Sequence, residues 1–166
     1  MNVQLVIEPY ATEALKEVVR EGLALYNVAA TGAAEYYPVC LLLKTEHQEV
    51  VGGLLGHIWA QCLHVAFLWV APFLRHYGYG TALLHAAEQL AAERACTMVQ
   101  LETFSFQAPG FYAKHGYETI AVLPDFPPGH QKHFLKKVLA RQERHTPEGG
   151  REHKGTASEN QGQGQS

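Results

Sequence analysis

The sequence predicts an α/β fold built on one mixed, largely antiparallel central sheet of about seven strands with flanking helices. Two observations lead to this prediction. Short apolar or alternating stretches that are typical of strands recur along the chain, and stretches with helical spacing separate some of them. One helical stretch, residues 80–94, joins two strands as a parallel crossover requires, whereas polar turns that suit antiparallel pairs join others.

The amino-terminal stretch predicts a strand and then a helix. Val3–Ile7 alternates weakly between apolar and polar residues, and Pro9 ends the strand. Thr12 suits a helix N-cap, because its hydroxyl can accept a hydrogen bond from a backbone amide of the first turn. The helix is expected to end near Gly32. Its apolar residues at helical spacing are Leu15, Val18, Val19, Leu23 and Tyr26.

The middle of the chain predicts three consecutive strands and a second helix. Residues 39–43 and 49–59 are apolar runs joined by a polar turn. Residues 64–70 are almost entirely apolar, as expected of a central strand that is covered on both faces. The helix over residues 80–94 follows. Its expected inner face carries Leu83, Leu84, Ala87, Leu90 and Ala91.

The last predicted elements lie between residues 98 and 139. Residues 98–104 alternate and predict a fifth strand, and a short helix that ends at Gly116 follows it. Two further strands are expected over residues 117–123 and 133–139, separated by a segment rich in turn-forming residues.

The composition changes at residue 141 and indicates where the domain ends. Residues 1–140 hold enough apolar residues for one domain with a full core. Residues 141–166 have almost no large apolar residue, so they cannot bury enough surface to offset the entropy cost of ordering. We therefore expect a disordered tail after the domain.

Charge and cysteine content exclude several classes of protein. The chain has 13 Lys and Arg against 16 Asp and Glu, a net charge of −3, which does not favour nucleic-acid binding. Its three cysteines are widely spaced and odd in number, which is typical of reduced thiols in a cytoplasmic protein. No segment has the apolar length of a membrane span or a signal peptide, and the ten histidines show no spacing that predicts a metal site.

The stretch from Leu68 to Thr81 predicts an anion-binding loop. It consists of a buried strand, a proline turn, a glycine loop and the start of a helix, where backbone N–H groups point outward and the helix dipole favours negative charge. Gly78 and Gly80 let a phosphate approach the main chain. The spacing of a P-loop is absent, and Leu83 stands where a dinucleotide fingerprint needs a small residue.

Two motifs carry a resemblance to a known family. Arg75-x-x-Gly78-x-Gly80 resembles the acetyl-CoA loop of the GNAT superfamily of N-acetyltransferases, whose signature is Gln/Arg-x-x-Gly-x-Gly/Ala. The segment that starts at Ala108 and contains Tyr112 resembles the GNAT segment Ala-x-x-x-Tyr-x-x-x-Gly-Phe/Tyr. The predicted order of elements is that of the GNAT fold. The resemblance implies an enzyme that uses acetyl-CoA as co-substrate.

The resemblance also implies how acetyl-CoA is held. The backbone of Leu68 and Val70, at the end of the fourth predicted strand, would pair with the pantetheine amides, and the amides of the loop would hold the pyrophosphate. Ser105 replaces an asparagine that often begins the second segment, so one contact to the cofactor differs. The loop residues expected at the cofactor are Arg75, His76, Tyr77, Gly78, Tyr79, Gly80 and Thr81.

Two residues are the candidates for proton transfer. Tyr112 corresponds to the tyrosine that commonly protonates the departing CoA thiolate in this family, although it could also simply pack a short helix against the sheet. His64 stands where many members carry a glutamate base, and an imidazole is a chemically sensible base at neutral pH. It is expected to share strand parity with Leu68 and Val70. Glu102 or a water chain are the alternative bases.

The acceptor is expected to be a primary amine of a small molecule, acetylated by direct transfer in a ternary complex. The resemblance places the acceptor groove between Tyr36–Tyr37 and Phe126–His130, which are aromatic and polar. A protein or peptide N-acetyltransferase and a non-catalytic acyl-CoA-binding module are the alternatives. The expected partner is the small-molecule substrate, with no nucleic acid, membrane or metal, and a homodimer is left open.

Overall fold

The computed structural model describes residues 1–140 of the chain. The expected tail, residues 141–166, lies outside the described residues. The elements are α1 (Glu13–Thr31), β1 (Tyr36–Lys44), β2 (Val50–Trp59), β3 (Cys62–Val70), the 3₁₀ helix η1 (Pro72–Leu74), α2 (Tyr79–Glu93), β4 (Met98–Phe104), α3 (Pro109–Lys114), β5 (Glu118–Pro124) and β6 (Gln131–Val138).

The strands form one mixed sheet in the order β1-β2-β3-β4-β6-β5. Among the strands of residues 1–140, only β3 and β4 run parallel, and α2 connects them as the predicted crossover. The α/β prediction is confirmed, except that the described residues form six strands rather than about seven. Val3–Ile7 forms no strand, because alternation alone does not stabilise an extended segment that has no neighbour to pair with, and its side chains are exposed.

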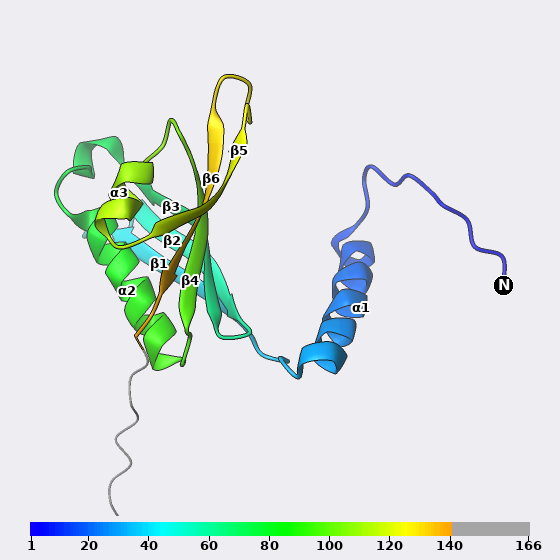
Figure 1. The fold of residues 1–166 in the computed structure, drawn as a ribbon. Coiled ribbons are helices and arrows are strands. Elements are labelled where there is room, and N and C mark those ends of the chain that lie inside the picture. Colours follow the sequence, from blue (N-terminus) through cyan, green and yellow to red (C-terminus); the bar gives the residue numbers. More distant parts are fainter. Residues whose placement is uncertain (141–166) are drawn as a thin grey trace, which may run out of the picture.

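The hydrophobic core lies between the sheet and α2, which crosses one face of the sheet (Figure 1). The inner face predicted for this helix is confirmed: four of its five residues are buried, and Leu90 packs at the margin of the core. Alternate side chains of each strand point to the face of the sheet away from α2 and lie outside this core. The fully buried residues with the largest side chains are Leu54, Leu63, Leu84, Leu135 and Val99.

The other face of the sheet, which we call the open face, has no helix packed on it among the described residues. Four large apolar side chains of β1, β2 and β3 lie there with 43–69% of their surface exposed. They are neighbours across the strands, because Leu55 pairs with Phe67, and Gly53 pairs with both Leu42 and Trp69. We call Leu42, Leu55, Phe67 and Trp69 the open-face patch.

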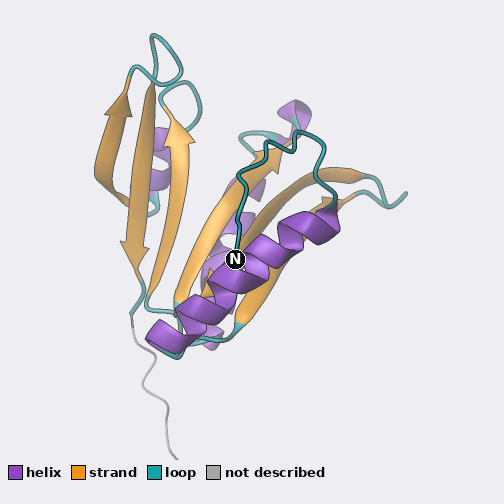
Figure 2. Cartoon of the chain, turned by 90° about the vertical axis from the view of Figure 1, so that its right-hand side faces the viewer, coloured by secondary structure: helices purple, strands orange, loops and turns teal. Residues whose placement is uncertain are grey.

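Helix α1 has the predicted caps and stands apart from the sheet. The Thr12 hydroxyl accepts a hydrogen bond from the Leu15 amide at 3.4 Å, and Gly32 ends the helix at φ 71°. None of the helix residues is buried, and Figures 1 and 2 show α1 on the side of the open face. No described helix is long and apolar enough to cross a membrane.

A partly buried polar network holds α2 to the last strand. Glu88 accepts a hydrogen bond from the Tyr117 hydroxyl at 2.9 Å and another from the Lys137 ammonium at 2.7 Å. Burial, together with the Glu88 carboxylate, raises the pKa of Tyr117, so the phenol remains a donor at neutral pH. One carboxylate therefore joins α2 to β6 and to Tyr117, in the turn before β5.

Replacing Glu88 by alanine should lower the free energy of unfolding by about 2 kcal/mol, because it leaves a buried hydroxyl and an ammonium without their acceptor. Chemical denaturation measures this loss. Glu118→Ala is the matched control, since the pair that Glu118 forms with Lys136 is largely exposed and should contribute little. Equal losses in the two variants would show that the Glu88 network contributes no more than a surface ion pair.

Candidate active site

Strands β3 and β4 pair along only part of their length. Their parallel register runs from Cys62 opposite Met98 to Val65 opposite Leu101, and both strands continue beyond that point. Figure 2 shows the two halves of the sheet parting toward the ends of these strands. The end of β3 therefore presents a strand edge that β4 does not cover, and we call this place the β3–β4 opening.

The register directs the backbone of Leu68 and Val70 toward the β3–β4 opening. The Ala71 amide donates to the Val51 carbonyl at 2.9 Å, so residue 71 bonds to β2. Hydrogen-bonding direction alternates along an antiparallel strand, and the polar backbone groups of residues 68 and 70 therefore face away from β2. A ligand in the opening would meet the backbone groups that the sequence analysis selected.

The loop after β3 presents a row of amides at the start of α2. Gly78 is the N-cap, at φ 87°, a conformation that side chains disfavour. The Ala82 amide makes the first helical hydrogen bond, to the Gly78 carbonyl at 3.0 Å, so the amides of Tyr79, Gly80 and Thr81 have no acceptor within the helix. This geometry would suit a phosphate, and phosphate binding by the loop stays a prediction.

Gly80 lies where three parts of the site meet. A Cβ added there would lie 3.6 Å from Cζ of Phe111 on α3 and 4.0 Å from Cδ2 of Leu68 on β3. Both distances are ordinary contacts, so packing within the protein does not require a glycine at this position. The absence of a side chain leaves room for a ligand beside the amides.

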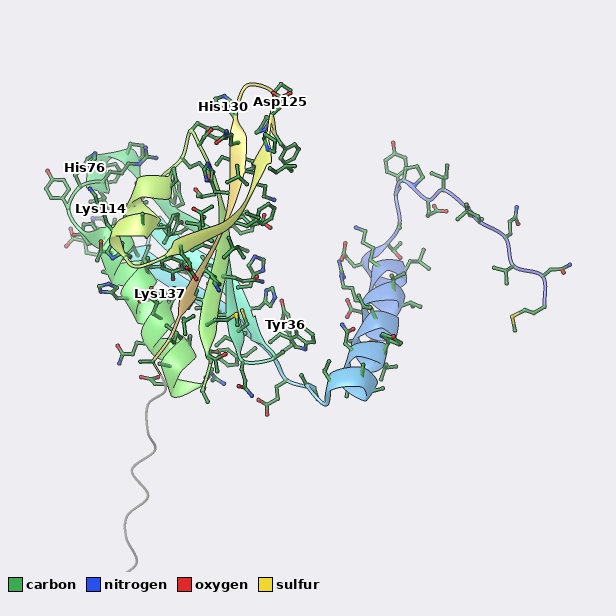
Figure 3. All side chains as sticks on the ribbon, in the orientation of Figure 1. Tyr36, His76, Lys114, Asp125, His130 and Lys137 are labelled. Carbon is green, nitrogen blue, oxygen red and sulfur yellow. The ribbon has the colours of Figure 1, made fainter. Side chains whose placement is uncertain are left out.

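The charged and hydroxyl side chains of the loop partly serve to hold it. The Arg75 Nε donates to the Val70 carbonyl at 3.2 Å, which ties the loop to the end of β3. The Thr81 hydroxyl lies 3.1 Å from Nε2 of His115, at the end of α3. His76 has φ 68° and projects from the surface (Figure 3), and Tyr77 is exposed as well.

Tyr112 is buried except for its hydroxyl. The residue is 8% exposed, and its ring packs against Phe111 and Tyr117. Within residues 1–140 no protein group bonds to the hydroxyl, yet no fully buried polar side-chain atom lacks a partner. The oxygen therefore reaches solvent. Burial raises the pKa of Tyr112, which keeps the phenol protonated.

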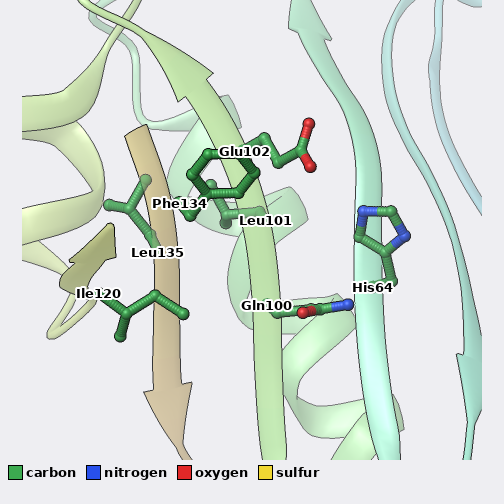
Figure 4. A pocket seen from close by; sticks show the side chains of 7 residues that line it. All are labelled: His64, Gln100, Leu101, Glu102, Ile120, Phe134 and Leu135. Atoms are coloured by element: carbon green, nitrogen blue, oxygen red, sulfur yellow. The ribbon is translucent and has the colours of Figure 1, made fainter. Parts of the chain in front are cut away.

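His64 lies on the open face, where it lines a hollow of about 100 Å³ (Figure 4). The predicted shared parity with Leu68 and Val70 is wrong. A bulge at Ala66 shifts the register between the Leu55–Phe67 and Gly56–Val65 pairs, so the side chains of residues 64 and 68 point to opposite faces. The hollow is lined by His64, Gln100, Leu101, Glu102, Ile120, Phe134 and Leu135.

His57 is a second imidazole at this place, and the sequence analysis missed it. Its ring stacks on Tyr36 at 4.9 Å and meets His64 edge-on at 5.1 Å between centroids. Burial, and then the neighbouring His64, lower the pKa of His57, so this imidazole is neutral at neutral pH. The two-residue turn at Ala60–Gln61 places residues 57 and 64 opposite each other, but Ala-Gln is not a residue pair that indicates such a turn in a sequence.

The structure also places the alternative base and the residues predicted to border the acceptor groove. Glu102 forms an ion pair with Lys132, so its carboxylate is already engaged by a cation. Tyr36 faces the open face, whereas Tyr37 points to the other face, where Arg94 lies 3.3 Å above its ring. Phe126–His130 forms the tip between β5 and β6 (Figure 3), and aromatic contacts join it to β4 and the loop that follows.

Comparison with known proteins identifies the family. The acetyltransferase (GNAT) family model matches residues 8–117, which include the loop, His64 and Tyr112. The chain belongs to the GNAT acetyltransferase family. The predicted fold and enzyme class are thereby confirmed, and enzymes of this family use acetyl-CoA.

Several relatives of this acetyltransferase have names or structures. It is 47% identical over 95 residues to a blasticidin-S acetyltransferase of Streptomyces morookaense, which covers 57% of this chain and 70% of the relative. An acetyltransferase of Agrobacterium fabrum is 27% identical over 132 residues, or 80% and 96% of the two chains. A crystal structure of a Bacillus cereus acetyltransferase superposes with a TM-score of 0.71 at 38% identity, over 81% of this chain and 98% of that chain.

Proposed function

We propose that this acetyltransferase moves the acetyl group of acetyl-CoA to a primary amine of a small molecule, by direct transfer in a ternary complex. One observation carries the proposal. Leu68 at the end of β3 and Phe111 of α3 both lie next to Gly80 in the first turn of α2, so the free amides of that turn adjoin the uncovered edge of β3. Tyr112 follows Phe111 in α3 and packs against its ring.

The residues present fit acetyl-CoA. The amides of Tyr79, Gly80 and Thr81 suit the pyrophosphate, and the hydrogen bond from Arg75 to the Val70 carbonyl holds their loop to the end of β3. The backbone groups of Leu68 and the Val70 amide suit the amides of pantetheine, because β4 leaves that edge of β3 uncovered, whereas the Val70 carbonyl already accepts a hydrogen bond from Arg75. Bound acetyl-CoA supplies an activated acetyl group as a thioester.

Proton transfer is assigned to groups on the two sides of the β3–β4 opening. Tyr112 donates a proton to the leaving sulfur, for which a phenol that stays protonated is suited. The open face supplies the base that removes a proton from the amine. His64 and His57 lie together there, and the lowered pKa of His57 keeps it able to accept a proton.

Direct transfer is favoured because the nearby cysteine is a poor nucleophile. Cys62 lies two residues before His64 on the open face, and burial raises the pKa of its thiol. A thiol that stays protonated does not readily form an acetyl-enzyme intermediate. Initial rates measured against both substrates should therefore give intersecting lines in double-reciprocal plots, whereas parallel lines would indicate a covalent intermediate.

The class of acceptor is proposed from the relatives and the site. A relative 47% identical over 95 residues is named for blasticidin S, so this compound is the first acceptor to test. Polyamines, amino-acid amines and peptides with a free N-terminus complete the panel. Release of CoA with a small amine and not with peptides supports the proposal. Turnover with peptides alone would favour a peptide acetyltransferase.

The pH dependence of kcat/KM tests the two imidazoles. A base must be unprotonated, so activity should fall as the pH drops through its pKa, and for His57 that pKa lies below its usual value of about 6.5. His57→Gln or His64→Gln, whichever removes the base, should abolish this acidic limb and lower the rate. If both variants retain the limb, neither histidine is the base, and Glu102 or water takes that role.

A further inference from the structure

We propose that the amino-terminal arm, residues 1–31, packs on the open face of a second copy of this chain, so that two chains exchange arms in a homodimer. Two surfaces of one chain carry the proposal. The first is the apolar stripe of α1, whose side chains are 55–73% exposed. The second is the open-face patch. The arm stripe consists of Leu15, Val18, Val19, Leu23 and Tyr26.

The arm stripe has the pattern of a helix that packs against a sheet. Its members follow one side of α1 at spacings of three, four and one residues, and the charged residues occupy the other side. There Glu13, Glu17, Lys16 and Arg20 form ion pairs along the helix. A helix of this kind buries its apolar side in a stable protein, and the described part of this chain buries none of it.

The open-face patch is the matching surface. It is contiguous across β1, β2 and β3, and the side chain of Leu42 leans over Gly53, where an added Cβ would lie 3.1 Å from its Cδ2. Figure 2 shows α1 in front of these strands, and Figure 1 shows that it stands apart from them. A large exposed apolar patch on a folded protein marks an interaction site.

The short connection between α1 and β1 favours a second copy over the chain's own sheet. Only residues 32–35 join the two elements, and hydrogen bonds fix them: the Trp59 indole donates to the Ala33 carbonyl at 3.2 Å, and the Ala33 amide donates to the Thr31 hydroxyl at 3.1 Å. Docking on its own sheet would require the arm to break these bonds and turn back. The open face of a second copy can bind the arm without a change in the direction in which the arm leaves its own sheet.

The exchange would also complete the proposed acceptor site. Phe67 and Trp69 of the patch lie on the same strand and the same face as His64. An arm that covers the patch would form one side of the hollow that His64 lines. This consequence rests on the proposed function, whereas the dimer itself does not.

Sedimentation equilibrium of the full chain tests the exchange without reference to activity. The wild-type protein should have twice the chain mass at micromolar concentration. Val19→Asp, in the arm stripe, and Leu42→Asp, in the patch, should each raise the dissociation constant at least about 100-fold, because a charge in an apolar interface is costly. Ala24→Asp is the matched control, since Ala24 lies on the opposite side of α1, and it should remain a dimer.

Mixing the two disrupted variants separates exchange from other arrangements. The Leu42→Asp chain keeps an unaltered arm, and the Val19→Asp chain keeps an unaltered patch. The arm of the first can therefore pack on the patch of the second, and the mixture should form heterodimers. A monomeric wild-type protein, a dimer that survives Val19→Asp, or a mixture that stays monomeric would each overturn the proposal.

Cross-linking gives a second readout that requires no disrupted interface. Cys40 is exposed on β1 next to the patch. In a Cys62→Ser background, Val19→Cys should link to Cys40 under oxidation and give a band of two chains on a non-reducing gel, whereas Ala24→Cys should not. A link within one chain would show that the arm docks on its own sheet.

Discussion

Replacing Tyr112 by phenylalanine should lower kcat about 100-fold, a typical contribution of one acid–base group. The variant keeps the ring and its packing against Phe111, so the fold should be unaffected. Acetyl-CoA affinity should hardly change, because the proton is needed mainly in the transition state. Steady-state kinetics with saturating acetyl-CoA, together with calorimetric binding of the cofactor, measure the two effects separately.

Tyr117→Phe is the matched control for this result. It also removes one phenol hydroxyl near the core, but that hydroxyl donates to Glu88 and serves the fold. The control should therefore lower stability and leave kcat within about threefold of the wild-type value. If Tyr112→Phe also changes kcat by less than about threefold, Tyr112 is a packing residue and the leaving thiolate obtains its proton elsewhere.

Replacing Gly80 by valine should abolish the rise in melting temperature that acetyl-CoA gives the wild-type protein. A ligand that binds only the folded state stabilises it by mass action, and the valine side chain would fill the space beside the loop amides. Differential scanning fluorimetry with acetyl-CoA, NAD and ATP measures the shift. NAD and ATP should have far smaller effects on the wild-type protein.

The Gly80 result needs a control for glycine replacement as such. Gly110 on α3 has open space at its Cβ position and is replaced by alanine in the control, which should retain the shift. Gly80→Ala should melt near the wild-type temperature without ligand, because its Cβ makes only ordinary contacts. An acetyl-CoA shift that persists in Gly80→Val would place the phosphates somewhere other than this loop.

The glycine N-cap and the helix start after β3 could be predicted from sequence because their determinants are local. A glycine N-cap, an adjoining helix start and an apolar strand before it are all consecutive in the chain, and the structure places them as expected. The start of α2 at Tyr79 differs by one residue from the predicted start. The caps of α1 are local in the same way.

The open face could not be predicted because it depends on pairing between distant residues. The bulge at Ala66 reverses which residues of β3 point to each face, and no single-strand pattern reveals an inserted residue. The pair of His57 and His64 arises from the register of a hairpin whose turn was not recognised. Val3–Ile7 has the pattern of a strand, yet a strand also needs a partner.

The most direct test of acetyl transfer is mass spectrometry of the acceptor after incubation with acetyl-CoA. Purified wild-type protein is given acetyl-CoA with blasticidin S or with each member of the amine panel, and Tyr112→Phe and protein-free samples serve as controls. We expect one acetyl group on an amine of a small acceptor, formed in equal amount to the CoA released and much more slowly by Tyr112→Phe. CoA binding without an acetylated small molecule in any sample, or acetyl groups on peptides alone, would contradict the proposed function.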